Sequence, residues 1–464
     1  MMSADLRDRI RKVLGPSRLE TREGLAERID DRAARARRAR GGRVVRERDV
    51  HDLVPGAVVD GPLGACFVAE QQYALDHRHG DESLGRFFEL TDRSLGCLAR
   101  WAEPLGVDRE SIVFLDTETT GLSGGTGTYA FMVGLAYFRD DRLIVRQFFM
   151  RDHAEEPAML AALNQELRRY EAVVTFNGKS FDVPLLLTRY TANRQRPSLP
   201  TEIHLDLLHP SRRFWREQLE SCTLGTLERA VLGHERSHDV PSWMVPELYF
   251  RYVRGDDPRM MVAVFEHNLH DVLSLVALTC RLGSLLDGTH IAPEAEVPLP
   301  ESFVPEASPS IFELFGAARI YEDLGLLEEA AARYEQALLR KRDVAVRARV
   351  ASRLAALCKR AGDHERAVEL WRRLGSLGLT GAEPFVELAK HFEHRARDYA
   401  AALSAVEEAL AVVEIQALRK QPGANAERAA LERRRSRLLE KQRRYTSAQR
   451  HGQAGEPEVA EVTG

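Results

Sequence analysis

Four acidic residues stand in three separated motifs of this 464-residue chain. Asp116 and Glu118 form an Asp-x-Glu pair, Asp182 ends the run from Asn177 to Asp182, and Asp271 follows His267 by four residues. Carboxylate oxygens are the ligands that Mg²⁺ and Mn²⁺ prefer. Two such ions can polarise a phosphate and stabilise the attacking and leaving oxygens when a phosphodiester bond is cleaved. The sequence therefore predicts a two-metal phosphodiester-cleaving site with Asp116, Glu118, Asp182 and Asp271 as ligands.

The first motif follows a short apolar run, residues 112–115, of the kind that forms a buried strand. Strand side chains alternate between faces, so Asp116 and Glu118 project to the same side and can bind one cation together. Two buried neighbouring carboxylates are costly without a cation or a proton. A strand end that meets solvent is the alternative for this pair taken alone. Residues 131–138 and 143–150 favour two further strands, and hence a three-stranded meander.

The second motif combines a strand over 172–176, a turn at Asn177 and Gly178, and a helix from Phe181 onward. Asp182 then lies in the first helical turn, where the helix dipole favours a carboxylate. Helix-end electrostatics alone is thus a sufficient explanation for Asp182. Lys179 is a candidate phosphate contact, with a solvated loop lysine as the alternative. Thr119, Asn177 and Lys179 are the predicted substrate-binding residues.

The third motif lies on a helix predicted over residues 260–286. His267 and Asp271 are four residues apart and share one helical face, although an ordinary surface pair has the same spacing. His270 lies about 100° round the helix from Asp271 and is the weaker catalytic candidate. A neutral His267 can orient or deprotonate the attacking water, because a histidine pKa of about 6.5 suits that task.

Together, the three motifs resemble the DEDD superfamily of 3′-5′ exonucleases, which share the RNase H-like fold. The run from Leu115 to Leu122 is similar to proofreading exonucleases, and the setting of Asp182 beside Asn177 and Phe181 is similar to the exonuclease domains of family B DNA polymerases. The resemblance implies an α/β RNase H-like domain with a mixed sheet flanked by helices. It also implies a metal-dependent 3′-5′ exonuclease that uses two Mg²⁺ or Mn²⁺ ions and acts on nucleic acid.

One spacing departs from that superfamily. Its two branches place either a tyrosine with three residues intervening before the last aspartate, or a histidine with four. This chain has His267 at the tyrosine spacing and Glu266 at the histidine spacing. The same departure, with the preceding segment 63–68 and carboxyl-terminal helical repeats, resembles bacterial YprB-like proteins with an RNase H-like domain. That likeness covers most of residues 50–290 and leaves DNA or RNA, and exonuclease or structure-selective endonuclease, open.

A scaffold that binds nucleic acid without cutting it, and docks proteins through its repeats, is the alternative function. Only the unusual spacing of His267 supports it, whereas a degenerate enzyme would typically have lost one of the four acids. Retention of all four carboxylates favours the enzyme.

Composition limits the other classes of protein. Hydrophobic residues make up 44% of the chain, which supports sizeable cores, and the net charge of -4 gives no global nucleic-acid signal. The five cysteines form no Cys-x-x-Cys pair, which indicates reduced thiols in a cytoplasmic protein. The amino terminus lacks the apolar core of a signal peptide, and no run approaches ~18 uncharged apolar residues, so we expect neither secretion nor a membrane span.

The chain changes character along its length. We expect a basic charged segment (1–48), a lead-in segment (49–108), the RNase H-like exonuclease domain (109–288), a proline-rich linker (289–310), helical repeats (311–414), and a charged helix with a disordered tail (415–464). A solvated, partly disordered charged helix, or an arm on a phosphate backbone, explains residues 1–48. For the basic stretch 433–444 the alternatives are a cap on the last helix, a contact with nucleic acid and a solvated charged helix.

The helical region repeats. Ala330, Ala367 and Ala402 occupy one equivalent position, spaced 37 and 35 residues apart, and a turn-like segment precedes each. This pattern is similar to tetratricopeptide repeats, whose period is about 34 residues. A generic helical bundle is the alternative, since several consensus positions are absent. The resemblance implies an all-α domain that binds a peptide or protein partner.

Overall fold

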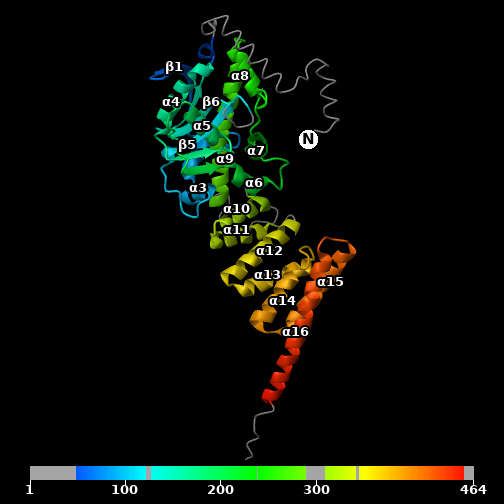
Figure 1. Cartoon of the computed structure of the whole chain (residues 1–464). Helices are drawn as coiled ribbons and strands as arrows, with labels where there is room; N and C mark the ends of the chain where they lie inside the picture. Colours follow the sequence, from blue (N-terminus) through cyan, green and yellow to red (C-terminus); the bar gives the residue numbers. More distant parts are fainter. Residues whose placement is uncertain (1–48, 122–126, 238, 289–308, 341–343, 454–464) are drawn as a thin grey trace, which may run out of the picture.

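The computed structural model describes residues 49–121, 127–237, 239–288, 309–340 and 344–453 (Figure 1). The basic segment 1–48, nearly all of the expected proline-rich linker and the end of the expected tail lie outside the described residues.

A seven-stranded sheet forms the amino-terminal half, with the strand order β1-β2-β7-β6-β5-β8-β9. Its strands are β1 (Gly56–Gly61), β2 (Gly64–Ala74), β5 (Ile112–Thr119), β6 (Ala130–Arg139), β7 (Arg142–Phe149), β8 (Ala172–Thr175) and β9 (Ile203–Asp206). Neighbours are antiparallel from β1 to β5 and parallel from β5 to β9. The predicted mixed sheet and the β5-β6-β7 meander are therefore confirmed. A separate hairpin pairs β3 (Arg78–His79) with β4 (Glu82–Ser83).

Helices cover this sheet. They are α3 (Asp92–Leu98), α4 (Glu156–Leu167), α5 (Asp182–Ala192), α6 (Leu208–Trp215), α7 (Leu224–Val231), α8 (Val245–Val253) and α9 (Met260–Asp287). Alternation along β5 divides the core: Val113 and Leu115 pack with α4, α5 and α8, whereas Ile112 and Phe114 pack with α3, α6 and α7. Asp116 and Glu118, near the end of the strand, follow Ile112 and Phe114 at every second position and therefore lie on the same face of the sheet.

The helix α9 is 28 residues long and apolar enough to cross a membrane by length and composition. However, 83% of its most apolar stretch is buried inside the protein. Its first turns, at Met261 and Phe265, pack in the core that contains α4, α5 and α8. The part from Val272 to Leu286 packs in the core that contains α3, α6 and α7. The helix is thus the central core helix of the sheet domain, and it carries His267 and Asp271 against β5 and β6.

The described part of the carboxyl-terminal half is all helical, as predicted. It contains α10 (Ile311–Asp323), α11 (Leu327–Leu339), α12 (Val344–Ala361), α13 (His364–Leu377), α14 (Glu383–His391), the π-helix η5 (Phe392–Ala396), α15 (Tyr399–Leu418) and α16 (Ala424–Gln453). Sequential helices pack in pairs, and Ala330, Ala367 and Ala402 are fully buried where they do so. Small residues permit this close approach; the assignment to tetratricopeptide repeats stays a prediction.

The helical half docks on the sheet domain through α10, which packs on α6 and α9 (Figure 1). A Cβ at Gly316 would lie 2.9 Å from the Cα of Phe214, so glycine permits this approach. Arg349 makes two hydrogen bonds of 2.7 Å to Glu217, and the Tyr321 hydroxyl donates to the Leu286 carbonyl at 2.9 Å. One apolar core is therefore continuous between the two halves.

Candidate active site

Glu118, His267 and Asp271 meet although they are far apart in the sequence. One ligand atom from each lies within 4.8 Å of the other two. The Nε2 atom of His267 is 3.6 Å from a carboxylate oxygen of Asp271 and 4.0 Å from one of Glu118. The end of β5 and the middle of α9 thus bring two of the predicted motifs together.

Asp116 is held by Asn268, a residue that the sequence did not single out. Asn268 Nδ2 donates to Asp116 Oδ2 at 2.9 Å, and Gln147 Nε2 donates to Asn268 Oδ1 at 3.0 Å. Gly134 lies opposite Asp116 in the sheet, and a Cβ there would lie 2.3 Å from Asn268 Oδ1. Glycine on β6 therefore makes room for the amide that orients the Asp116 carboxylate.

Asp182 is the first residue of α5 and is buried. The Thr117 hydroxyl, on the strand position between the first two acids, donates a hydrogen bond to Asp182. This bond ties the second motif to the first. Asp182 is close enough to raise the pKa of both Asp116 and Glu118, so the four predicted ligands act as one electrostatic group.

Burial is the main cause of the raised carboxyl pKa values in this group. It raises the pKa of Asp116 well above its usual range, with help from Asp271 and Glu118. It raises the pKa of Glu118 to about 8 against the opposing effect of His267, and that of Asp182 to about 6 against the hydrogen bond from Thr117. Burial also raises the pKa of Asp271, although Arg236 lowers it.

Two buried carboxylates, Glu118 and Asp182, and two half-buried ones, Asp116 and Asp271, require protons or cations when they lie this close together. The donor set is carboxylate oxygen with one imidazole, which fits Mg²⁺ or Mn²⁺. Asp116, Glu118, Asp182 and Asp271 are thus the residues that can hold divalent ions here.

His267 is oriented by Asp239, which the sequence did not reveal. His267 Nδ1 lies 2.7 Å from an Asp239 carboxylate oxygen. An ionised carboxylate only accepts, so Nδ1 carries the proton and Nε2 is turned toward Glu118 and Asp271. Burial alone would lower the pKa of His267, but the carboxylates of Asp271, Glu118 and Asp239 raise it. Glu266, at the alternative spacing, is exposed on α9.

Arg236 is a further residue that the sequence did not indicate. Its guanidinium donates to Asp271 and also to Glu228, with a 2.8 Å bond from Nε to the second Glu228 oxygen. Arg236 and Asp239 stand on the connection between α7 and α8, which has no periodic pattern. No local signal could have placed them against α9.

Of the predicted substrate-binding residues, Thr119 ends β5, whereas Asn177 and Lys179 lie in the loop between β8 and α5. The Thr119 hydroxyl donates to the Gly121 carbonyl at 2.9 Å. The backbone N–H groups of Asn177 and Lys179 donate to the two oxygens of Asp206 at 2.8 and 3.1 Å, while both side chains are exposed. Asp206, at the end of β9, therefore shapes the loop that precedes Asp182. Substrate binding by Thr119, Asn177 and Lys179 stays a prediction.

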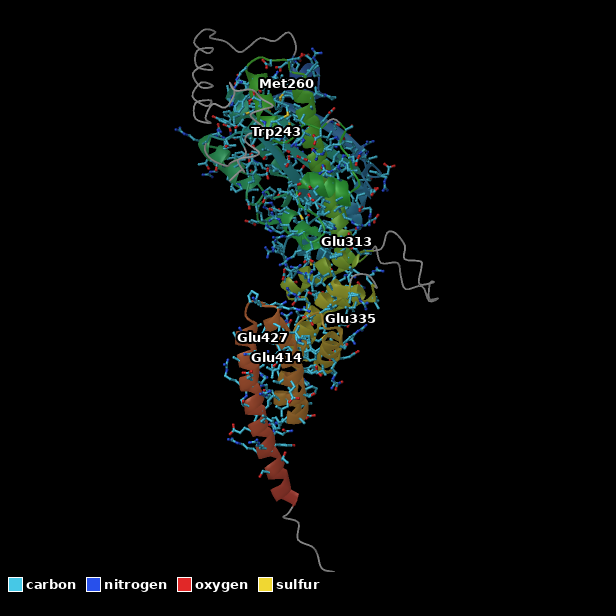
Figure 2. All side chains as sticks on the ribbon, turned by 90° about the vertical axis from the view of Figure 1, so that its right-hand side faces the viewer. Trp243, Met260, Glu313, Glu335, Glu414 and Glu427 are labelled. Atoms are coloured by element: carbon cyan, nitrogen blue, oxygen red, sulfur yellow. The ribbon has the colours of Figure 1, made fainter. Side chains whose placement is uncertain are left out.

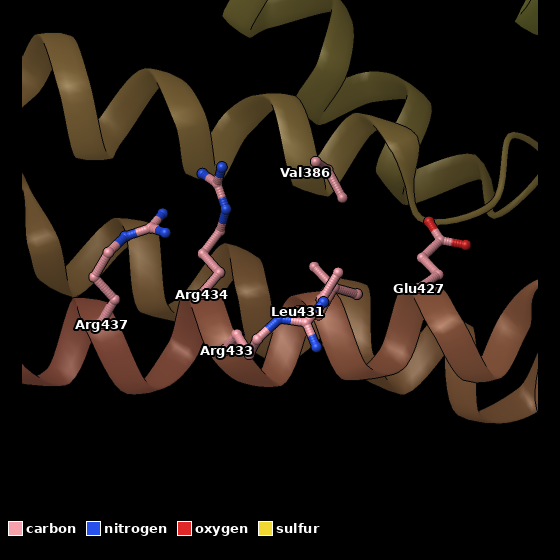
Figure 3. Close-up of a pocket in the computed structure, with 7 residues that line it drawn as sticks. Val386, Glu427, Leu431, Arg433, Arg434 and Arg437 are labelled. Atoms are coloured by element: carbon pink, nitrogen blue, oxygen red, sulfur yellow. The ribbon is translucent and has the colours of Figure 1, made fainter.

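The basic stretch 433–444 lies on α16, in the helical half. A hollow of about 390 Å³ between α14 and α16 is lined partly by Arg433, Arg434 and Arg437 (Figure 3). Glu393, whose side chain is fully buried, makes ion pairs of 3.0, 3.2 and 2.9 Å with Arg434, Arg437 and Lys441. Part of the basic charge thus fixes α16 to the π-helix.

Comparison with known proteins gives three findings. A model described as the RNase_H superfamily matches residues 113–282, which include all four acids. A family B DNA polymerase from the archaeon Pyrobaculum calidifontis is similar over 48% of this chain and 29% of its own length, with 16% identity and a TM-score of 0.32, a likeness too weak to carry an argument. The uncharacterized protein YprB of Bacillus subtilis strain 168 is 32% identical over 349 residues, which are 74% of this chain and 80% of that protein. The chain therefore belongs to the YprB family and contains an RNase H superfamily domain.

Proposed function

We propose that this chain is a metal-dependent nuclease that hydrolyses phosphodiester bonds of nucleic acid as a 3′-5′ exonuclease. The observation that carries the proposal is the convergence of Glu118, His267 and Asp271 within 4.8 Å, with Asp116 and Asp182 in the same electrostatic group. Three elements far apart in the chain must fold together to create it. An RNase H-type fold supports the nuclease class, and the order of the three acidic motifs supports the exonuclease.

Two Mg²⁺ or Mn²⁺ ions bound by the four carboxylates would polarise the scissile phosphate and stabilise the attacking and leaving oxygens. The chain's own task is to keep the ligands in place. Asn268 orients Asp116, and the Thr117 hydroxyl orients Asp182. Such supporting hydrogen bonds fix the geometry that catalysis needs.

His267 supplies the proton acceptor. With its Nδ1 proton donated to Asp239, its Nε2 lone pair points to the side where Glu118 and Asp271 stand. A water on that side can be oriented and deprotonated by Nε2. In the metal-free protein the carboxylates of Asp271, Glu118 and Asp239 raise the pKa of His267. Divalent ions bound by Glu118 and Asp271 would oppose that effect and favour the neutral imidazole, which is the form that acts as a base.

Trp243 is a further residue that we propose as a substrate contact. Trp243 is labelled in Figure 2, and its side chain is 70% exposed. The neighbouring Ser242 places its hydroxyl 3.4 Å from His267 Nε2. An exposed aromatic ring on the residue next to one that contacts a nuclease site can stack on a base, an interaction worth about 1–3 kcal/mol that tolerates any base. We assign Trp243 to holding the terminal nucleotide.

The helical half is proposed to dock a protein partner. Its paired helices build on repeated buried alanines, and repeat arrays offer extended surfaces of this kind.

A non-catalytic nucleic-acid-binding scaffold is the competing function. The observation in its favour is that Arg236 already pairs with Asp271, one of the four predicted ligands. A scaffold would bind nucleic acid and leave it intact with any divalent ion.

The deciding experiment uses the purified full chain with Mn²⁺ on 5′-labelled single- and double-stranded DNA and RNA. The exonuclease shortens a labelled strand stepwise from its 3′ end, and a phosphorothioate at that end blocks it. Cleavage of a circular strand would instead identify an endonuclease. Asp116→Asn should abolish cleavage and Glu266→Gln, on the exposed face of α9, should not. Binding without cleavage under every condition would establish the scaffold.

A further inference from the structure

A second cluster of side chains that could hold a metal ion includes His270, the residue before Asp271. It consists of His79 on β3, His234 in the loop after α7, and His270 on α9, with one ring nitrogen from each within 4.8 Å of the other two. His79 is 3% exposed, and the other two are half-buried. The exonuclease chemistry proposed above makes no use of these residues.

The spacing of the rings suits a tetrahedral ion. His234 Nε2 lies 3.2 Å from His270 Nδ1, and the centres of these two rings are 5.1 Å apart. His79 stacks on His234 with ring centres 3.9 Å apart, so the His79 ring would turn to bring its nitrogen to the ion. Two nitrogens bound at 2.0–2.1 Å to one tetrahedral Zn²⁺ stand ~3.3 Å from each other. The 3.2 Å pair therefore needs little movement to bind one ion.

Outer hydrogen bonds fix the tautomer of His79. Its Nε2 lies 2.7 Å from the Ser274 hydroxyl, which donates its only proton to Glu228 at 2.5 Å. His79 Nε2 must therefore be the donor to Ser274, which leaves Nδ1 with a lone pair. An imidazole whose second nitrogen donates toward a carboxylate is the usual arrangement of a histidine ligand.

The backbone around the cluster is built for close approach. Gly80, with φ +61°, would place a Cβ 2.0 Å from the Leu232 carbonyl oxygen, and Gly233, with φ +63°, would place one 2.6 Å from Asp81. The Asp81 N–H donates to the Leu232 carbonyl at 2.7 Å. Each glycine is a chain neighbour of one of the clustered histidines, so the hairpin and the loop hold His79 and His234 in fixed positions.

We propose that His79, His234 and His270 form a Zn²⁺ site with three protein ligands, separate from the carboxylate site. Imidazole nitrogen suits Zn²⁺, whereas Mg²⁺ and Mn²⁺ prefer oxygen, so the two sites select different ions. Burial, with a smaller contribution from His234 and His270, lowers the pKa of His79 to about 2, and the neutral ring is the state that binds metal.

The ion would act on the active site through the loop that it fixes. His234 precedes Arg236 and Asp239 in the chain, and these contact Asp271 and His267 on α9. A bond from His234 and His270 to one ion would tie that loop to α9. Ser274 and Glu228 extend the link, because Glu228 accepts hydrogen bonds from both Ser274 and Arg236.

Zn²⁺ titration of the chelator-treated full chain in saturating Mg²⁺ tests the proposal. We expect one Zn²⁺ per chain, affinity at least about 100-fold weaker in His234→Ala and in His79→Gln, and no change in the matched control His209→Ala, an exposed histidine on α6. Co²⁺ should give the visible spectrum of a tetrahedral nitrogen-rich site in the parent chain and lose it in His234→Ala. His79→Gln and His234→Ala should melt like the metal-free parent, which shows that they fold.

A variant of the carboxylate site tests whether Zn²⁺ binds there instead. Glu118→Gln should keep the Zn²⁺ site unchanged. The proposal is overturned if the parent binds no Zn²⁺ under these conditions, or if Zn²⁺ binding survives in His234→Ala and disappears in Glu118→Gln, which would place the ion at Glu118, His267 and Asp271.

Discussion

Arg236 donates a hydrogen bond to Asp271, so a protein cation already partly neutralises one of the four acids at the candidate site. The same guanidinium pairs with Glu228, whose side chain is 2% exposed. Both the charge at Asp271 and the burial of Glu228 therefore depend on Arg236.

Removing the positive charge of Arg236 should tighten metal binding at the carboxylates. Arg236→Gln alone would leave Glu228 as an unpaired buried charge, a loss of about 3–5 kcal/mol of stability. We therefore compare Glu228→Gln/Arg236→Gln with Glu228→Gln. The double variant should bind Mn²⁺ about five- to tenfold more tightly, equivalent to ~1–1.4 kcal/mol, because Asp271 no longer shares its charge. Electron paramagnetic resonance of free Mn²⁺ measures this; equal affinities would mean that Asp271 is no ligand.

The raised carboxyl pKa values predict how pH acts on the metal-free protein. A carboxyl group whose pKa is higher in the folded state stabilises the fold below its unfolded pKa, and this stability is lost as pH rises through the folded pKa. For Glu118 the window runs from 4.5 to about 8, and for Asp182 from 3.8 to about 6. The raised pKa of His267 acts in the same direction. The free energy of unfolding in chelator should therefore fall between pH 5 and pH 8.

Divalent ions should reverse that loss, because they replace the protons. Thermal unfolding at pH 6 and pH 8, with chelator or with Mn²⁺, is the measurement. Mn²⁺ should raise the unfolding midpoint more at pH 8 than at pH 6, and Glu118→Gln should reduce the difference. An equal effect of Mn²⁺ at both pH values would show that the carboxylates are not protonated when metal-free.

Local patterns sufficed for the elements that carry the acids. The apolar run before Asp116, the turn before Asp182 and the helical period around Asp271 are all contained in a few neighbouring residues, and each gave the strand or helix that the structure shows. Asp239 and Arg236 could not be found this way. They reach α9 from a loop without periodicity, and their pairing with His267 and Asp271 exists only in three dimensions.

Asn268 was hidden for a different reason. A polar residue on a core helix has many structural uses, and its partner Asp116 is 152 residues away. The three clustered histidines share that difficulty, since β3, the loop after α7 and α9 meet only through the fold.

Asn268 should matter through Asp116 and not through contact with substrate. Asn268→Ala removes the 2.9 Å bond to Asp116, and the loss of such a supporting partner typically costs about 10–100-fold in metal affinity or activity. Mn²⁺ affinity and kcat should fall together. Asn164→Ala, which removes a buried asparagine of α4 that bonds the 196–198 backbone, is the matched control and should alter stability only. Unchanged Mn²⁺ affinity in Asn268→Ala would contradict the positioning role.

Trp243 should contribute to substrate binding more than to turnover. Loss of one stacking contact of about 1–3 kcal/mol corresponds to a KM increase of about 5- to 150-fold in Trp243→Ala. Trp243→Phe keeps a stacking face and should recover most of it. Trp101→Ala removes another exposed tryptophan, 38% accessible, and serves as the control. A fall in kcat with unchanged KM would show that Trp243 does not stack on the substrate.

His267→Ala should lower kcat by about 10²–10⁴-fold with little change in KM, because a general base acts mainly in the transition state. Glu266→Ala, one residue earlier on the exposed face of α9, should turn over like the parent. His267→Tyr should recover part of the loss, since a phenol at the tyrosine spacing can also hold a water.

The pH profile of kcat in Asp239→Asn distinguishes a catalytic role of His267 from a structural one. Asp239→Asn no longer stabilises the charged imidazole, so the acid limb of the kcat profile should move to lower pH. Asp239 is one of the carboxylates that raise the pKa of His267, so the limb of the parent should lie at higher pH than that of Asp239→Asn. Single-turnover rates of His267→Ala within about threefold of the parent, with the acid limb unmoved in Asp239→Asn, would remove His267 from the chemistry and leave Asp239 as a partner in packing only.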